Sequence, residues 1–83
     1  MNSGELDRLL KDYLEAKFGL ALDYFMIEGR ITPDANGDMG VTGSYTKKAG
    51  DKKVLFTVTV NVASRKIQNL QEYWTLINPK EQR

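Results

Sequence analysis

The chain has 83 residues, of which 41 % are hydrophobic and 28 % are charged, and its formal net charge is +1. It contains no cysteine and no histidine, which excludes disulfides, thiolate metal sites and the commonest general base of enzymes. A single domain of this size, residues 1–83, buries only roughly 60–65 % of the surface that its unfolded chain exposes. No apolar run approaches the ~20 residues of a membrane span, and the N-terminus lacks the pattern of a signal peptide. We therefore expect a cytoplasmic protein with a thin margin of stability and no membrane partner.

The first expected element is an amphipathic helix over residues 4–18. Asn2 or Ser3 suits the N-cap, and Gly19 suits the left-handed position that ends a helix. The apolar residues recur at spacings of three and four, which places them in one stripe: Leu6, Leu9, Leu10, Tyr13, Leu14 and Phe18. A helix of this length is marginal alone, so we expect the stripe to pack on a sheet.

Residues 21–32 and 39–47 are expected to form the first two strands. Gly29 lies inside the first strand, where a glycine indicates a bulge or a close approach of another element. The turn at 33–38 contains Asn-Gly, the strongest short hairpin signal. Alternation assigns Phe25, Ile27 and Ile31 to one face of the first strand. It assigns Met39, Val41, Gly43 and Tyr45 to one face of the second.

Residues 53–62 show the clearest strand pattern in the chain. Val54, Phe56, Val58, Val60 and Val62 occupy every second position, and such residues suit a pleated, half-buried surface. The intervening residues are Leu55, Thr57, Thr59 and Asn61. We therefore expect this strand to be central, with its valine face under the helix.

The segment 67–77 fits either a strand or a second helix. We favour a strand, because the turn at 63–66 would pair it with 53–62 and its second half is rich in aromatic and β-branched residues. Asn78-Pro79 ends it, and residues 78–83 are expected to be a frayed tail.

The elements together predict an α+β domain in which one N-terminal helix packs on a four-stranded antiparallel meander sheet. This order resembles the helix-on-curved-sheet topology of cystatin-like and nuclear-transport-factor-like domains. Cystatins carry a Gln-x-Val-x-Gly hairpin motif, and the nearest match here is Met39-Gly-Val41-Thr-Gly43, with Met in place of Gln. The resemblance implies the fold, and protease inhibition is not carried over.

A possible calcium loop at Asp34, Asn36 and Asp38 has oxygen ligands at alternate positions. The pattern then departs from an EF-hand, because Met39 stands where Gly is needed and Tyr45 where the bidentate Glu is needed. A polar hairpin turn is the favoured interpretation.

Glu28 and Glu72 are the two carboxylates expected inside strands. Paired carboxylates can perform acid–base chemistry, but no nucleophile or phosphate loop accompanies these two. We expect both to point into solvent from edge strands, where charge discourages edge pairing. The prediction is therefore a protein that is not an enzyme, with no catalytic, cofactor or metal site.

Four lysines surround the second turn: Lys47, Lys48, Lys52 and Lys53. They could contact nucleic acid or an acidic partner, although no aromatic residues alternate with them as in a stacking platform. Solubilising turn charge is the favoured interpretation.

The outer strands carry large apolar residues on both faces, although one helix can cover only one face. Tyr24, Met26, Tyr73 and Trp74 are the candidate contact residues. Exposed apolar patches mark interfaces, so we predict a protein-binding, adaptor or inhibitor-type domain that acts through a sheet face or edge, on a protein partner or as a homodimer. The alternative is a small-ligand pocket between helix and sheet, with the predicted lining Leu10, Leu14, Phe25, Phe56 and Trp74.

Overall fold

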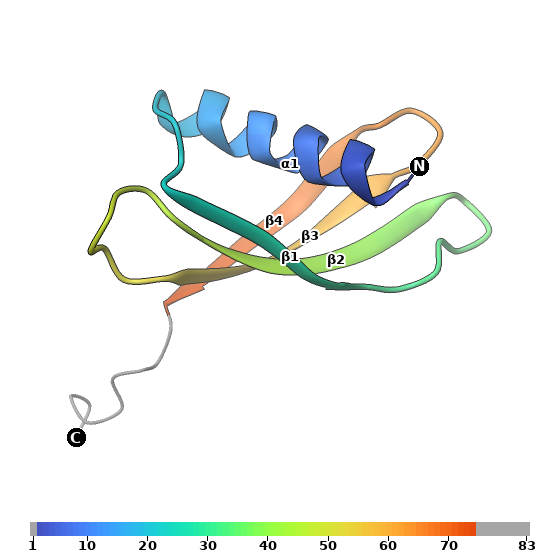
Figure 1. Cartoon of the computed structure of the whole chain (residues 1–83). Helices are drawn as coiled ribbons and strands as arrows, with labels where there is room; N and C mark the ends of the chain where they lie inside the picture. Colours follow the sequence, from blue (N-terminus) through green and yellow to red (C-terminus); the bar gives the residue numbers. More distant parts are fainter. Residues whose placement is uncertain (1, 75–83) are drawn as a thin grey trace, which may run out of the picture.

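The computed structural model describes residues 2–74 of the chain. Helix α1 (Ser3–Phe18) is followed by strands β1 (Tyr24–Arg30), β2 (Asp38–Thr46), β3 (Val54–Asn61) and β4 (Ile67–Trp74). The strands form one antiparallel sheet in chain order, β1-β2-β3-β4, and α1 lies along one side of it (Figure 1). The predicted α+β class and meander are confirmed. The described part of 67–77 is a strand, and the predictions for 75–77 and for the tail 78–83 lie outside the described residues.

Helix α1 begins and ends at the residues that its sequence indicates. The Asn2 side chain accepts from the Glu5 N–H at 2.8 Å, and the Glu5 carboxylate accepts from the Asn2 N–H at 3.1 Å, which forms a capping box. Gly19 ends the helix with φ 73°, in the left-handed region that glycine tolerates. No described helix is long and apolar enough to cross a membrane.

The core lies between α1 and one face of the sheet. Leu6, Leu10 and Leu14 are each 1 % exposed, and burial of each contributes about 2 kcal/mol. Strands β2 and β3 supply the opposite wall with the alternating residues that the sequence predicts: Met39, Val41, Tyr45, Val54, Phe56, Val58 and Val60. Tyr13 was predicted in the buried stripe and is instead 37 % exposed, because it lies at the border of the narrow leucine row.

A bulge at Glu28 changes which residues of β1 face the core. Ile27 pairs with Gly43 and Gly29 pairs with Thr42, so Glu28 is an extra residue in β1. The prediction that Ile31 shares the buried face of Phe25 and Ile27 is therefore wrong. Ile31 is 67 % exposed beside Gly40, because the extra residue inverts the alternation after it.

The second edge strand, β4, is irregular as well. Thr57 pairs with Gln71 and Thr59 with Gln68, and Asn69 between them has φ 56°. Both edges of the sheet therefore carry a bulge, a feature that hinders pairing with a further strand.

Gly43 lies where the backbone of β1 and the Phe56 ring come close to β2, so that no side chain fits at this position. A Cβ atom at Gly43 would collide with the backbone oxygen of Met26 and would lie 2.7 Å from Cζ of Phe56. A larger residue would push the Phe56 ring out of its place in the core.

We therefore expect Gly43→Ala to lower the free energy of unfolding by about 3 kcal/mol, because backbone cannot move aside cheaply. Gly40→Ala is the matched control in the same strand, since its Cβ would meet only the end of the exposed Ile31 side chain, at 3.2 Å. Urea denaturation of both variants measures the difference. Equal stability of the two would contradict this account of the packing.

Candidate functional site

An apolar row crosses the sheet on the side away from α1, here called the far face. In the strand register Met26 is opposite Ser44, Ser44 is opposite Leu55, and Leu55 is opposite Tyr73. Met26, Leu55 and Tyr73 are 47 %, 38 % and 48 % exposed and are here called the far-face ridge. Met26 and Tyr73 are predicted contact residues, whereas Leu55 is not. The sequence signal for Leu55 is that it lies on the face of 53–62 opposite to the valine face.

The other two predicted contact residues, Tyr24 and Trp74, are not part of the ridge. Tyr24 is half-buried, and its hydroxyl donates to Sδ of Met26 at 3.5 Å, so it adjoins the ridge. Trp74 ends β4 opposite Val54 in the register.

A shallow groove of about 620 Å³ runs beside the ridge on the far face. Its lining includes glycines and threonines from β1, β2 and β3, whose small side chains leave the sheet surface low. These are Gly29, Gly40, Thr42, Thr57 and Thr59. We call this the far-face groove.

The four lysines of the second turn do not all lie on the same side of the molecule. Nζ of Lys47 lies 4.2 Å from the Phe18 ring centroid at the helix side, whereas Nζ of Lys53 lies 5.1 Å from the Tyr24 ring centroid. Lys48 and Lys52 are exposed in the turn itself. Two of the four ammonium groups therefore make cation–π contacts with separate parts of the molecule.

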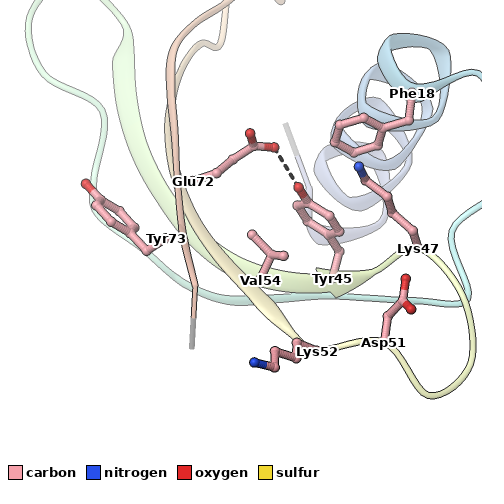
Figure 2. Close-up of a pocket in the computed structure, with 8 residues that line it drawn as sticks. All are labelled: Phe18, Tyr45, Lys47, Asp51, Lys52, Val54, Glu72 and Tyr73. Carbon is pink, nitrogen blue, oxygen red and sulfur yellow. Dashed lines mark hydrogen bonds between the residues drawn. The ribbon is translucent and has the colours of Figure 1, made fainter. Parts of the chain in front are cut away.

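A hollow of about 510 Å³ lies where the C-terminal end of α1 meets β2, β3 and β4 (Figure 2). Phe18, Tyr45 and Val54 contribute its apolar lining, and Lys47, Lys52 and Glu72 contribute charge. None of the predicted pocket residues with a described side chain is in this lining: Leu10, Leu14, Phe25 and Phe56. Leu10, Leu14 and Phe56 are each 1 % exposed in the filled core.

Tyr45 and Glu72 form the strongest polar contact of this hollow. The Tyr45 hydroxyl donates to Oε2 of Glu72 at 2.6 Å, and Figure 2 shows the two side chains pointing toward each other while Tyr73 points away. Burial raises the pKa of the Tyr45 phenol well above its ordinary value, and the hydrogen bond and charge of Glu72 raise it further. Tyr45 therefore stays a neutral donor.

The two strand carboxylates cannot act as a pair. Ser44 is fully buried and donates to Oε2 of Glu28 at 2.8 Å, while the next residue, Tyr45, donates to Glu72. Consecutive strand residues point to opposite faces, so the two carboxylates lie on opposite faces as well as on opposite edges. Both carboxylates are exposed on edge strands, as predicted. Each also accepts a hydrogen bond from a buried hydroxyl group, which the sequence pattern does not indicate.

The polar segment at 33–38 is a turn, as predicted. Oδ1 of Asp34 accepts from the backbone N–H groups of Asn36 and Asp38, and Gly37 has φ 85°. Oδ1 of Asp38 accepts from Asn61 at 3.0 Å, so this carboxylate ties the turn to β3. Across residues 2–74 no group of three or more acidic side chains is placed to hold a metal ion.

The Tyr45 contact predicts a specific dependence of stability on pH. Tyr45→Phe should cost about 1 kcal/mol at neutral pH through loss of the hydrogen bond. Since the folded-state pKa is raised, the advantage of the wild type is complete below about pH 10 and is lost as the pH rises further. Urea unfolding of both proteins across this pH range measures the difference.

Tyr73→Phe is the matched control, because its exposed hydroxyl donates only to the exposed Gln71. An advantage of the wild type over Tyr45→Phe that persists unchanged in strong base would show that the folded state does not hold this proton.

Comparison of the chain with protein-family models, with curated proteins and with solved structures finds no match. The likeness to cystatin-like and nuclear-transport-factor-like domains therefore stays a prediction from topology.

Proposed function

We propose that this chain is a protein-binding module that acts through the far face of its sheet. The observation that carries the proposal is the far-face ridge, three large side chains from β1, β3 and β4 that are between 38 % and 48 % exposed and lie in one row across the sheet. No element within residues 2–74 covers them (Figure 1). Aromatic residues and Met are enriched where proteins contact one another, and the ridge has both.

The irregular edge strands β1 and β4 favour binding through the sheet face over the addition of a further strand at an edge. Added strands need a regular row of unpaired N–H and C=O groups. The bulges at Glu28 and Asn69 interrupt that row on both edge strands. We therefore propose binding through the sheet face, whereas the sequence predicts a face or an edge.

The charge distribution supports a protein partner over nucleic acid. Nucleic-acid surfaces need several cations that reach phosphates together. Two of the four turn lysines lie over separate aromatic rings, Lys47 over Phe18 and Lys53 over Tyr24, and the ridge itself is uncharged. Contact of the lysine turn with nucleic acid, and the absence of enzyme activity, stay predictions.

The test is capture of a partner by tagged protein from nuclease-treated lysate of the source. We expect Met26→Lys to reduce the captured partner about tenfold or more, because it places a charge in the apolar ridge. Tyr13→Lys is the matched control, since Tyr13 is 37 % exposed on the helix layer. Equal capture by wild type and Met26→Lys would refute the proposal.

A small ligand in the hollow at the end of α1 is the second candidate function. Its volume of about 510 Å³ is in the range of small-molecule sites, and the neutral Tyr45 donor beside Glu72 provides a polar anchor.

A fragment screen followed by amide and methyl NMR shifts tests this second function. Binding should move the resonances of Phe18, Tyr45 and Val54 and leave Thr57 and Thr59 unchanged. A screen at millimolar fragment concentration that never moves the first group would remove this candidate.

A further inference from the structure

We infer that the partner on the far face is a second copy of this chain, with the ridge of each copy in the groove of the other. The inference rests on the proposed function, because it names the occupant of the same surface. It is carried by the shape, the charge and the size of the far face.

Shape is the first argument. The ridge and the groove lie side by side along the strands, since Leu55 of the ridge is followed on the same face by Thr57 and Thr59 of the groove. A two-fold axis that crosses the strands at Thr57 exchanges the two features. Each Leu55 then lies over Thr59 of the other copy, and such a surface is complementary to itself.

The groove has a volume of about 620 Å³ and is open over Thr57 and Thr59 of β3. Gly29 has no side chain, and the exposed Ile31 side chain lies over Gly40 at the β1 edge of the groove. The far-face ridge contributes the three large apolar side chains of Met26, Leu55 and Tyr73. Packed sheets interdigitate large and small side chains in this way, at a separation of about 10 Å.

Charge is the second argument. In a two-fold interface every charge near the axis approaches its own copy, so a charged centre would repel itself. Among the groove residues that the structure describes, Arg30 at the β1 edge is the charged one. Two further charges lie away from the axis at Thr57: Glu28 on the edge strand β1, where it accepts from Ser44, and Lys53 before β3, where it lies over Tyr24.

Size is the third argument. Four strands about 4.8 Å apart and about seven residues long give a face of roughly 450 Å². Pairing two such faces buries roughly 900 Å², which is less than the roughly 1,200–2,000 Å² of stable specific interfaces and is in the range of weak, transient ones. The dimer should therefore be weak and its population should depend on concentration.

Charge-swap variants on the ridge and on the groove test this pairing. Leu55→Glu alters the ridge and Thr59→Lys alters the groove. Each alone should raise the dimer Kd at least about tenfold, because a charge is buried against an uncharged surface. An equimolar mixture should recover dimer, since Glu at 55 of one copy meets Lys at 59 of the other while the second contact stays wild type.

Sedimentation equilibrium of the wild type, each variant and the mixture gives the masses, and circular dichroism melting confirms that each variant is folded. A wild type that stays monomeric at all concentrations, or a mixture no more dimeric than its components, would overturn the inference. So would a dimer that Leu55→Glu leaves unchanged. A monomeric wild type whose partner capture is still lost in Met26→Lys would overturn self-pairing and leave the proposed function standing.

Cross-linking gives an independent readout, because the chain has no cysteine of its own. Thr57→Cys places a thiol near the two-fold axis, and a short bifunctional maleimide should join two copies. Asp12→Cys, on the exposed side of α1, is the control and should stay monomeric. Equal cross-linking of both variants would count against the far face.

Discussion

The packing of Leu6, Leu10 and Leu14 of α1 against the buried face of β2 and β3 is the contact on which the rest of the structure depends. A lone helix of this length is marginal, and the sheet without α1 would expose its apolar face to water, so each layer stabilises the other. The layer order also leaves the far face without cover from residues 2–74. Because the one described helix covers one face of the sheet, Met26 and Tyr73 on the other face are exposed.

Two hydroxyl groups of β2 connect the central sheet to its edges. Ser44 donates to Glu28 of β1, and Tyr45 donates to Glu72 of β4. Because the two donors are consecutive, one contact lies on each face of the sheet. Exposed carboxylates thereby satisfy buried hydroxyls that would otherwise lose their hydrogen bonds, and both edge strands retain a charge that discourages aggregation.

The bulge at Glu28 has consequences for both the fold and the proposed interface. It interrupts the β1 edge, directs Glu28 to Ser44 and moves Gly29 and Ile31 to the far face. Gly29 and Ile31 thereby line the groove beside the ridge. An irregularity of one residue therefore changes which side chains form the β1 side of the surface from which self-pairing is inferred.

Local sequence determined the elements that depend on near neighbours. Asn2, Glu5 and Gly19 specify the ends of the helix, and the alternation of β2 and β3 specifies their buried faces. These features could be predicted because capping and period-two alternation act over a few residues. The glycine in β1 also signalled a bulge.

Only the tertiary structure decided which residues meet across strands. The position of Ile31, the pairing of Ser44 with Glu28 and the row from Met26 to Tyr73 all depend on register. Register is a property of two or more strands together, and a bulge shifts it by one residue without a change in composition. The hollow at Tyr45 and the separation of the turn lysines likewise depend on where the end of α1 packs, which no local pattern specifies.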